Sequence, residues 1–304
     1  MKDSILYVFT KCFPYGNHEQ YLNAELEILS RNFENVILVP TEYFDSDFTI
    51  SKILPRNFSV FNINNDSANF KVKNRSKFEF LKILLLEFIF ESDKLRFIKE
   101  FQRYYSILSY QFVLANRFSY QIHKNENQNK KVFLYSYWLH NSAVMLGLLR
   151  KRKVISNFIS RAHSIDLFHN DWPFAYSKDV KVLPFQYFKT KMATEIHAVS
   201  DYGTRYLKNK YPRFNGKFFT SKLGIHDNGV GKFDQKEVFT MVSCSSVSEN
   251  KRVTEIARLF SLLDFPANWI HFGEGEKMDE VKNIVSNLPS YLNAKLCGYT
   301  QNEK

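Results

Sequence analysis

Val242-Ser243-Cys244-Ser245-Ser246-Val247-Ser248-Glu249-Asn250-Lys251-Arg252-Val253 is the most informative stretch of the sequence, because it joins a strand pattern to a helix pattern through a turn of small residues. The apolar run Val238–Val242 is typical of a buried strand. Apolar residues at helical spacing then predict an amphipathic helix, and they are Val253, Ile256, Ala257, Phe260 and Leu263. A strand, a tight turn and a helix N-terminus commonly bind phosphate in α/β proteins.

Two cations stand at the start of this predicted helix, Lys251 and Arg252. The helix dipole disfavours positive charge at this end by about 0.3–1 kcal/mol. The two side chains are therefore better explained if an anion binds between them, and we expect them to hold a phosphate group. The alternative is that both extend into water as ordinary surface residues.

The sequence after this stretch predicts a small α/β unit. We expect a strand at Asn268–Phe272, a helix at Lys277–Ser286 and a strand at Leu292–Cys297. The turn Gly273-Glu274-Gly275 follows the first of these strands and resembles a fragment of a dinucleotide-binding fingerprint. Its three residues are therefore candidates for ligand binding. The alternative is that the glycines only permit a tight turn.

The first two thirds of the chain alternate predicted strands and helices, an order typical of a parallel sheet with helices on its faces. Strands are predicted at Ile5–Phe9, Val36–Val39, Phe58–Ile63, Val132–Trp138, Val154–Ser160, Glu195–Val199 and Lys217–Leu223. Helices are predicted at Glu19–Phe33, Lys77–Ile122 with a break near Ser92-Asp93, Leu139–Leu149 and Asp201–Lys210.

A polar stretch with two glycines, Asp227–Lys236, separates these two parts and predicts a linker. The sequence therefore predicts an α/β protein of two Rossmann-like domains. The first domain is expected at residues 1–226, the linker at 227–236 and the second domain at 237–304. The second domain has room for only about three strands, so we expect it to be incomplete.

Candidate site residues follow the predicted strands of the first domain, because ligands of open α/β sheets bind beyond the carboxyl ends of strands. His163 and Asp166 lie in Arg161-Ala162-His163-Ser164-Ile165-Asp166, and His140 follows another strand. An imidazole there can donate a hydrogen bond to a sugar or phosphate, and Asp166 could fix its tautomer. The alternative is that His163 has only a structural role.

The bulk composition limits the function classes. The chain has 304 residues, 44% of them hydrophobic, which suits two globular domains. Its net charge of +11 favours anionic partners. The sequence has no run of basic residues and no nucleic-acid module, so we do not expect nucleic acid as a partner. Three widely spaced cysteines, no secretory signal and no apolar segment long enough to span a bilayer predict a cytoplasmic protein.

Asp45-Ser46-Asp47 is the candidate for a metal site. We interpret it as a solvated loop, because two aspartates in a polar loop are common and no third ligand is near. We therefore expect no metal and no cofactor.

The stretch from Lys94 to Arg117 mixes basic and aromatic residues. One interpretation is a surface that contacts an anionic membrane. The alternative is a core stripe with a solvated basic face. The residues concerned are Lys94, Arg96, Lys99 and Arg103, interleaved with Phe97, Phe101 and Tyr104.

Taken in order, the motifs of the chain resemble those of the group 1 glycosyltransferases with the GT-B fold, especially bacterial members that build surface polysaccharides. The matching pieces run from near residue 5 to near residue 300. They are Phe13-Pro14-Tyr15-Gly16 with Glu19 and Glu25, Tyr135-Ser136-Tyr137-Trp138, Arg161-Ala162-His163-Ser164-Ile165-Asp166, Ala198-Val199-Ser200 with Tyr206-Leu207, Lys222-Leu223-Gly224-Ile225, Val242-Ser243-Cys244-Ser245 with Lys251-Arg252, and Ile270-His271-Phe272-Gly273-Glu274-Gly275.

The resemblance implies a nucleotide-sugar donor, a glycan or lipid-linked acceptor, transfer with retention of configuration and no essential metal. Lys251, with Arg252, would match the lysine that holds the donor diphosphate. His163 would match the histidine near the transferred sugar, and Gly16 would lie in the loop that approaches the donor phosphates. Arg161 and His140 would then lie on the acceptor side.

Two departures from the family pattern affect this expectation. The family often has an arginine five residues before the lysine, and here that position is Ser246. The family's donor domain carries a later pair of glutamates, separated by seven residues, that contact the donor, and we expect this chain to stop before that point. Glu19 and Glu27 have this spacing, but they lie on the first predicted helix. We therefore expect a truncated, poorly active transferase.

Two other functions are compatible with the sequence. The first is a non-catalytic binding module that docks on a membrane or on a polysaccharide-synthesis enzyme. The second is a nucleotide-sugar epimerase of the same fold, for which we find no catalytic constellation. The expected location is the cytoplasm, with possible peripheral contact to the inner face of the cell membrane.

Overall fold

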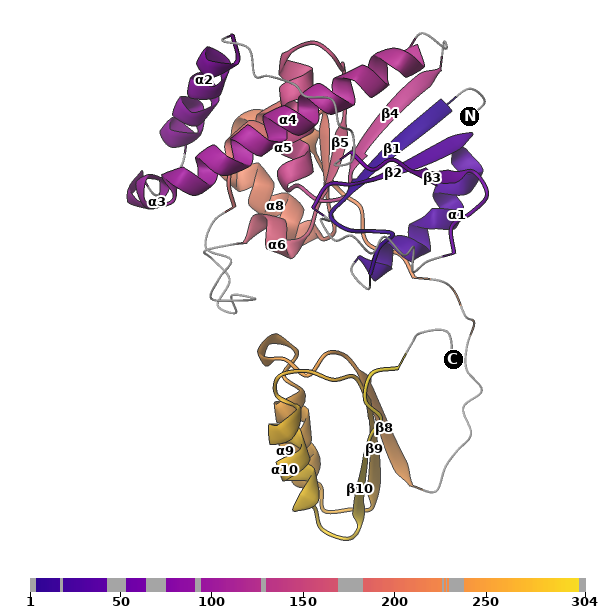
Figure 1. Ribbon diagram of the computed structural model, residues 1–304. Coiled ribbons are helices and arrows are strands. Elements are labelled where there is room, and N and C mark those ends of the chain that lie inside the picture. Colours follow the sequence, from indigo (N-terminus) through magenta and orange to yellow (C-terminus); the bar gives the residue numbers. More distant parts are fainter. Residues whose placement is uncertain are drawn as a thin grey trace. The chain divides into compact units, whose positions relative to one another are not determined.

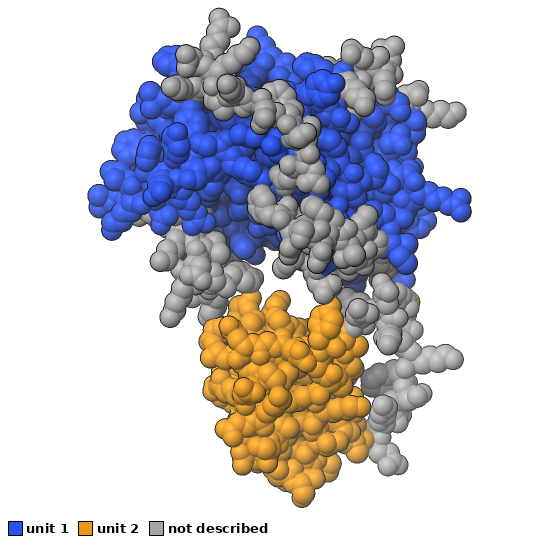
Figure 2. Space-filling model, viewed as in Figure 1, with its two compact units in different colours: residues 1–172, 177–227 blue, residues 173–176, 228–304 orange. Residues whose placement is uncertain are grey.

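The computed structural model describes residues 4–16, 19–42, 53–63, 75–90, 94–126, 130–168, 183–225, 227, 229 and 238–300. The chain divides into two compact units, residues 1–172 with 177–227 and residues 228–304 with 173–176 (Figure 2). The candidate metal loop Asp45-Ser46-Asp47 lies outside the described residues, as does most of the predicted linker Asp227–Lys236.

A parallel sheet forms the centre of unit 1 (Figure 1). Its strand order is β3-β2-β1-β4-β5-β6-β7, and each adjacent pair is parallel. All residues of β1 are buried, as expected for a strand covered on both faces. The strands are β1 (Ser4–Thr10), β2 (Asn35–Pro40), β3 (Phe58–Val60), β4 (Lys131–Ser136), β5 (Ile159–Ala162), β6 (Glu195–Ala198) and β7 (Phe218–Thr220).

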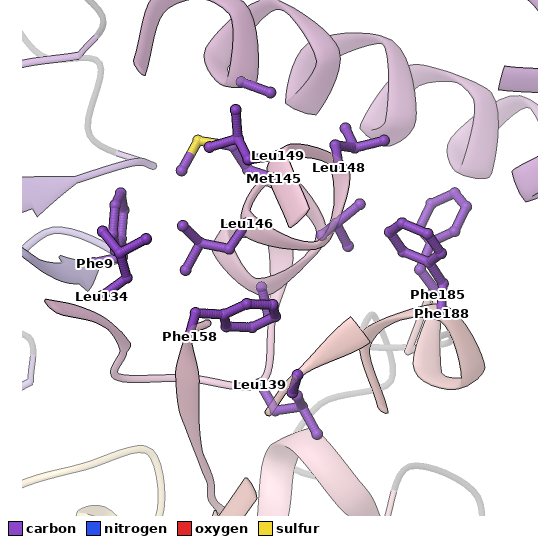
Figure 3. Packing of buried hydrophobic residues seen from close by; sticks show 14 of the residues in the cluster. Phe9, Leu134, Leu139, Met145, Leu146, Leu148, Leu149, Phe158, Phe185 and Phe188 are labelled. Atoms are coloured by element: carbon purple, nitrogen blue, oxygen red, sulfur yellow. The ribbon is translucent and has the colours of Figure 1, made fainter. Parts of the chain in front are cut away.

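Helices cover both faces of this sheet. Alternate residues of β1 enter two separate cores: Tyr7 packs with α4 and α5, and Leu6 packs with α1. Helix α5 is buried from Ser142 to Leu149 and supplies the middle of the larger core (Figure 3). The helices are α1 (Asn23–Asn32) after a 3-10 turn η1 (Gln20–Leu22), α2 (Arg75–Phe90), α3 (Lys94–Lys99), α4 (Phe101–Glu126), α5 (Asn141–Lys151), α6 (Ser164–Leu167), α7 (Gln186–Met192), α8 (Asp201–Lys210) and η2 (Pro212–Lys217).

The predicted strand Val154–Ser160 is wrong in its first part, because β5 begins only at Ile159. The preceding residues end α5 instead. Lys153 has φ of 61°, and the backbone N–H of Val154 donates to the carbonyl oxygen of Leu149 at 2.9 Å. Strands β3, β4 and β7 also end earlier than predicted.

Helix α7 was not expected from the sequence. Its first backbone N–H groups are capped by a distant side chain, since the carboxylate of Glu87 on α2 accepts from Tyr187 at 3.2 Å and from Phe188 at 3.1 Å. A negative charge at a helix N-terminus stabilises that helix. This cap comes from a residue about 100 positions earlier, so no local pattern indicates it.

Unit 2 is a three-stranded parallel sheet of order β10-β9-β8, and its predicted strands and helices are confirmed. Helices α9 and α10 lie over the same face of this sheet (Figure 1). The core between sheet and helices is centred on Trp269, which is fully buried. The elements are β8 (Phe239–Cys244), η3 (Glu249–Lys251), α9 (Val253–Ser261), β9 (Ala267–Phe272), α10 (Met278–Ser286) and β10 (Leu292–Leu296).

The region from Lys94 to Arg117 forms α3 and most of α4. Phe97 and Tyr104 are buried in the core of unit 1, so for these aromatic side chains the alternative interpretation as a core stripe is correct. Phe101 remains nearly half exposed. None of the described helices is both long and apolar enough to cross a membrane.

Candidate functional site

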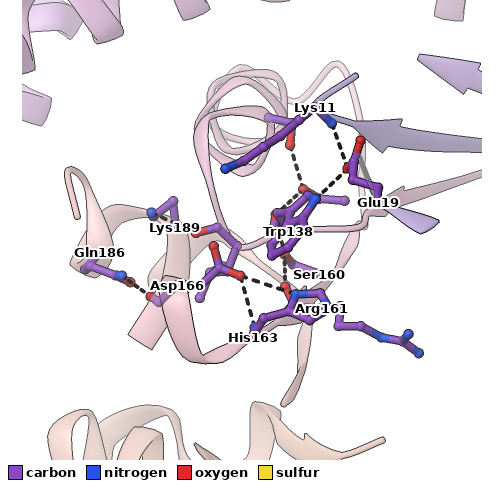
Figure 4. A network of polar contacts seen from close by, with 12 residues as sticks. Lys11, Glu19, Trp138, Ser160, Arg161, His163, Asp166, Gln186 and Lys189 are labelled. Carbon is purple, nitrogen blue, oxygen red and sulfur yellow. Dashed lines mark hydrogen bonds and ion pairs between the residues drawn. The ribbon is translucent and has the colours of Figure 1, made fainter. Parts of the chain in front are cut away.

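Polar side chains gather at the carboxyl ends of β1, β4 and β5 in unit 1 (Figure 4). Glu19 closes the loop that follows β1. One of its carboxylate oxygens accepts from the backbone N–H of Lys11 at 3.0 Å and from the indole of Trp138 at 2.5 Å. The other oxygen accepts from the backbone N–H groups of Cys12 at 2.8 Å and Phe13 at 2.7 Å. An internal carboxylate therefore already binds three successive N–H groups of this loop.

Gly16, predicted to approach the donor phosphates, ends the same loop. It is exposed, and its φ of 62° is a conformation that glycine adopts without strain. The preceding turn is fixed by the backbone N–H of Tyr15, which donates to the carbonyl oxygen of Cys12 at 3.0 Å. Gly16 thus lies in the loop after β1, and its approach to the donor phosphates stays a prediction.

His163 follows β5 directly and precedes α6. Its ring lies among three aromatic rings, with centroid distances of 4.2 Å to Trp138, 5.4 Å to Tyr137 and 6.0 Å to Tyr21. The side chain is 8% exposed. Neither ring nitrogen has a hydrogen-bond partner among the described residues, although buried polar atoms are nearly always paired.

Asp166 binds the backbone of His163 rather than only its ring. Its Oδ2 accepts from the His163 N–H at 3.0 Å and lies 3.5 Å from Nδ1. Burial alone would raise the pKa of Asp166, but the hydrogen bonds and the charge of His163 lower it. Asp166 therefore holds the turn and also forms an ion pair with the ring Nδ1, while Nε2 is buried without a hydrogen-bond partner among the described residues. That Asp166 fixes the tautomer of His163 stays a prediction.

Lys189 is a buried cation behind this turn that sequence reasoning missed. It is 1% exposed, and its Nζ donates to the carbonyl oxygen of Leu139 at 2.9 Å. Burial lowers the pKa of Lys189 to about 8, while the charges of Asp166 and Glu87 act to raise it. No local pattern reveals this residue, because Lys189 lies on α7, which the sequence did not predict.

Arg161, predicted on the acceptor side, is tied inside unit 1. Its Nη1 forms an ion pair with Glu25 of α1, and its guanidinium lies 5.6 Å from the ring centroid of Tyr137. Burial raises the pKa of Glu25, although Arg161 acts to lower it. Arg161 therefore links α1 to β5 and stands beside one wall of the His163 site.

His140 is half-buried at the start of α5. Its Nδ1 lies 2.9 Å from an oxygen of Glu42, which also accepts from the side-chain amide of Asn141 at 3.0 Å. Burial would raise the pKa of Glu42, but His140 lowers it by hydrogen bonding and charge. His140 thus holds the loop after β2 against the loop after β4.

The candidate loops of unit 2 pack closely against each other. A side chain at Gly273 would place its Cβ 1.8 Å from the carbonyl oxygen of Ser245, and one at Gly275 would lie 2.5 Å from that of Val247. Gly273 also has φ of 141°, which side chains rarely adopt. The tight turn therefore explains why glycine stands at both positions, as the alternative interpretation proposed.

Lys251 and Arg252 lie at the start of α9, as predicted. Both are exposed, and Arg252 has φ of 54° at the N-cap position. The neighbouring Glu249 is paired with Lys277 at 3.3 Å, so this acid is directed to α10. Glu274 is exposed between the two loops.

A second buried histidine, His271, was not singled out from the sequence. Its Nδ1 lies 2.8 Å from the hydroxyl of Ser243, which also accepts from the indole of Trp269 at 2.9 Å. Burial lowers the pKa of His271. The position of this residue inside the small core makes it a structural contact of β8 and β9.

The structure thus brings Gly16, Arg161, His163 and Asp166 to one edge of unit 1, and Lys251 with the glycine turn to one edge of unit 2. Among the described residues, no three His, Cys, Asp or Glu side chains are grouped in a way that could hold a metal ion.

The chain matches known proteins among solved structures. No family model matches the sequence. No curated protein is similar to it either. The lipopolysaccharide outer core galactosyltransferase WaaB matches with a TM-score of 0.54 and 10% identity, over 98% of this chain and 68% of its own. Anabaena Alr3699/HepE in complex with UDP-glucose matches with a TM-score of 0.56 and 10% identity, over 98% of this chain and 69% of its own.

These matches extend over both units and establish the fold. The chain has the GT-B glycosyltransferase fold, with a seven-stranded parallel sheet in unit 1 and a three-stranded parallel sheet in unit 2. The fold class predicted from the sequence is confirmed. The structures compared are longer, since the chain spans about two thirds of each.

Proposed function

We propose that this chain transfers a sugar from a nucleotide-sugar donor to a glycan or lipid-linked acceptor, with retention of configuration and without an essential metal, in the synthesis of surface polysaccharide. The observation that carries the proposal is the His163 imidazole, whose Nε2 is buried without a hydrogen-bond partner among the described residues. It lies at the carboxyl edge of a parallel sheet, where ligands of open α/β folds bind.

The surroundings of His163 suit a sugar. A sugar hydroxyl can satisfy the Nε2 of this ring, by donating to it or by accepting from it. The aromatic faces of Tyr21, Tyr137 and Trp138 give an apolar wall for the C–H groups of the ring. Tyr21 is 44% exposed, so it is accessible from solvent.

Under this proposal, unit 2 holds the donor. The structure of Anabaena Alr3699/HepE that resembles this chain contains UDP-glucose. Lys251, Arg252 and the N-terminus of α9 supply positive charge for a diphosphate. The bond between the sugar and the diphosphate breaks as the acceptor hydroxyl bonds to the same carbon from the same face, which retains its configuration, and the hydroxyl proton passes to the leaving diphosphate. The negative charge that develops on the leaving diphosphate is then stabilised by these groups.

The protein groups in unit 1 position the sugar and the acceptor. His163 donates a hydrogen bond to the sugar being transferred. Asp166 fixes the turn that carries this ring, and His140 with Arg161 borders the acceptor side. The proposal gives Glu19 the separate role of holding the loop of Gly16 in shape.

Release of nucleotide from a panel of nucleotide sugars, with membrane extract as acceptor source, tests the proposal. His163→Ala should lower acceptor-dependent release at least about tenfold, the loss of one transition-state hydrogen bond. His197→Ala is the matched control, because His197 on β6 is paired with Glu195 at 2.9 Å.

Equal release by the His163→Ala and His197→Ala proteins would remove His163 from the mechanism. Calorimetry with the same sugars covers the alternative function. No binding and no release across the whole panel contradicts the proposed sugar transfer, whereas binding without release fits a chain that holds the donor but does not transfer it.

A further inference from the structure

The cation that stands beside the His163 site is paired inside unit 1. Arg161 of β5 forms an ion pair with Glu25 of α1, and the two side chains are only 12% and 16% exposed. The second carboxylate oxygen of Glu25 accepts from the hydroxyl of Tyr135 at 3.4 Å. Glu25 thus directs one oxygen to the cation and the other to a phenol, so the charge of Arg161 is compensated within the protein.

This ion pair acts on the same space as the imidazole. The guanidinium of Arg161 lies 5.6 Å from the ring centroid of Tyr137, and that ring lies 5.4 Å from the ring of His163. Burial raises the pKa of Glu25, whereas the charges of Arg161 and His163 act to lower it. Glu25, Arg161 and His163 therefore form one electrostatic group, and a charge on a ligand of His163 would act on all three.

Two other cations lie near this site, and each is withdrawn from it. Lys189 is 1% exposed, and its Nζ donates to the carbonyl oxygen of Leu139. The Nζ of Lys11 lies 5.1 Å from the ring centroid of Trp138, and Figure 4 shows Lys11 and His163 on opposite sides of that ring. Neither lysine therefore offers its charge to a ligand of His163.

The aromatic wall of the site also disfavours an anion. The rings of Tyr21, Tyr137 and Trp138 have centroids between 4.2 Å and 6.0 Å from that of His163. The face of an aromatic ring carries negative partial charge, so it suits the C–H groups of a neutral sugar and repels a carboxylate. An anion that loses its hydration here without gaining a cation is costly to bind.

We propose that Glu25 determines the charge class of the transferred sugar, because by neutralising Arg161 it admits neutral sugars and excludes uronic acids, which carry a carboxylate. Arginine is a preferred partner of carboxylates, since its N–H groups match both oxygens. Without Glu25, Arg161 would be such a partner beside His163. This inference rests on the proposed sugar transfer and adds to it the class of sugar.

A matched pair of donors tests the inference, with membrane extract as acceptor source. The pair is the best neutral nucleotide sugar of the panel and its uronic acid counterpart, for example UDP-glucose and UDP-glucuronate. In the wild-type chain, kcat/KM for nucleotide release should be at least about tenfold higher with the neutral donor. Glu25→Gln should lower this ratio at least about tenfold, because Arg161 becomes an uncompensated cation. Glu27→Gln is the control on the same helix, since the Glu27–Arg31 pair is exposed and its loss should leave the ratio unchanged.

The ratio does not depend on the folded fraction of a variant, because both donors meet the same protein. Equal kcat/KM for the two donors in the wild-type chain overturns the inference, and so does the same ratio in Glu25→Gln and Glu27→Gln. The wild-type comparison needs no variant, so it decides the inference even where Glu25→Gln does not fold. No release from any donor of the panel is a different outcome, which overturns the proposed sugar transfer and this inference with it.

Discussion

The carboxylate of Asp166 accepts the backbone N–H of His163 at 3.0 Å, and the Asp166 N–H donates back to the carbonyl oxygen of His163 at 3.0 Å. These reciprocal bonds fix the turn from β5 into α6. The imidazole is therefore positioned through its backbone, by the ion pair of Nδ1 with Asp166 and by the aromatic rings around it, and its Nε2 has no hydrogen-bond partner among the described residues. The shape of the site depends on the charge of Asp166.

Asp166→Asn should destabilise unit 1 by about 1.5–3 kcal/mol at neutral pH, because a buried hydrogen bond to a charged acceptor is lost. The folded pKa of Asp166 is lowered from 3.8 by His163, despite burial that raises it. Such a group stabilises the fold above its unfolded pKa and loses this effect as pH falls through the folded pKa. The difference from wild type should therefore shrink below about pH 4.

Urea unfolding at several pH values measures this difference. Asp264→Asn is the control, because Asp264 is exposed in unit 2 and should change stability little. A deficit of Asp166→Asn that is as large at pH 3 as at pH 7 would contradict the assigned charge.

Because of Lys189, the free energy of unfolding of unit 1 should increase as the pH rises from about 8 to 10.5. Burial lowers its pKa from 10.5 to about 8, so between these values the unfolded chain binds more protons at this residue than the folded chain. Stability rises with pH wherever the unfolded state binds more protons, here by about 3 kcal/mol at most. Lys189→Met should remove this rise.

The comparison needs Lys191→Met, an exposed lysine of the same helix, as the control. Unfolding free energies of the three proteins between pH 7.5 and 10.5 give the result. Parallel curves for wild type and Lys189→Met would show that Lys189 titrates normally.

The hydrophobic pattern of the sequence predicted those strands and helices whose apolar residues lie within the element itself. Strand β1 was predicted because it is continuously apolar, and α9 because Val253, Ala257 and Phe260 share one buried face. The candidate histidines were placed correctly at strand ends for the same reason, since the order of strands and helices fixes where a parallel sheet collects its loops.

What the sequence could not predict depends on distant partners. Helix α7 needs the cap from Glu87. Lys189 is buried because α7 packs against α5 and α2 and because Gln186 of α7 donates to the carbonyl oxygen of Asp166. Glu19 was visible as part of a motif. Its role was not visible, because the indole of Trp138 that it binds lies 119 residues away.

Glu19→Gln should destabilise unit 1 by about 2–3 kcal/mol, because an amide has one acceptor oxygen where the carboxylate uses both. Either the Lys11 N–H with the Trp138 indole, or the N–H groups of Cys12 and Phe13, would then face an amide N–H. Thermal unfolding measures the loss. Glu27→Gln is the control, since the Glu27–Arg31 pair is exposed and should contribute less than about 1 kcal/mol. Equal losses for the two variants would refute the bracing role of Glu19.

Gly273→Ala should destabilise unit 2 by at least about 2 kcal/mol, since the residue would be strained and its Cβ would overlap backbone. Its φ is 141°, and the added Cβ would lie 1.8 Å from the carbonyl oxygen of Ser245. The loops after β8 and β9 would have to separate and lose the bond from the Ser245 N–H to the carbonyl oxygen of Phe272.

Gly224→Ala is the control, because no atom lies within 4 Å of the added Cβ. Amide hydrogen exchange distinguishes the units: protection of β8 and β9 should fall in Gly273→Ala while that of β1 stays unchanged. Full protection of β8 and β9 in this variant would mean that the two loops have room for a side chain.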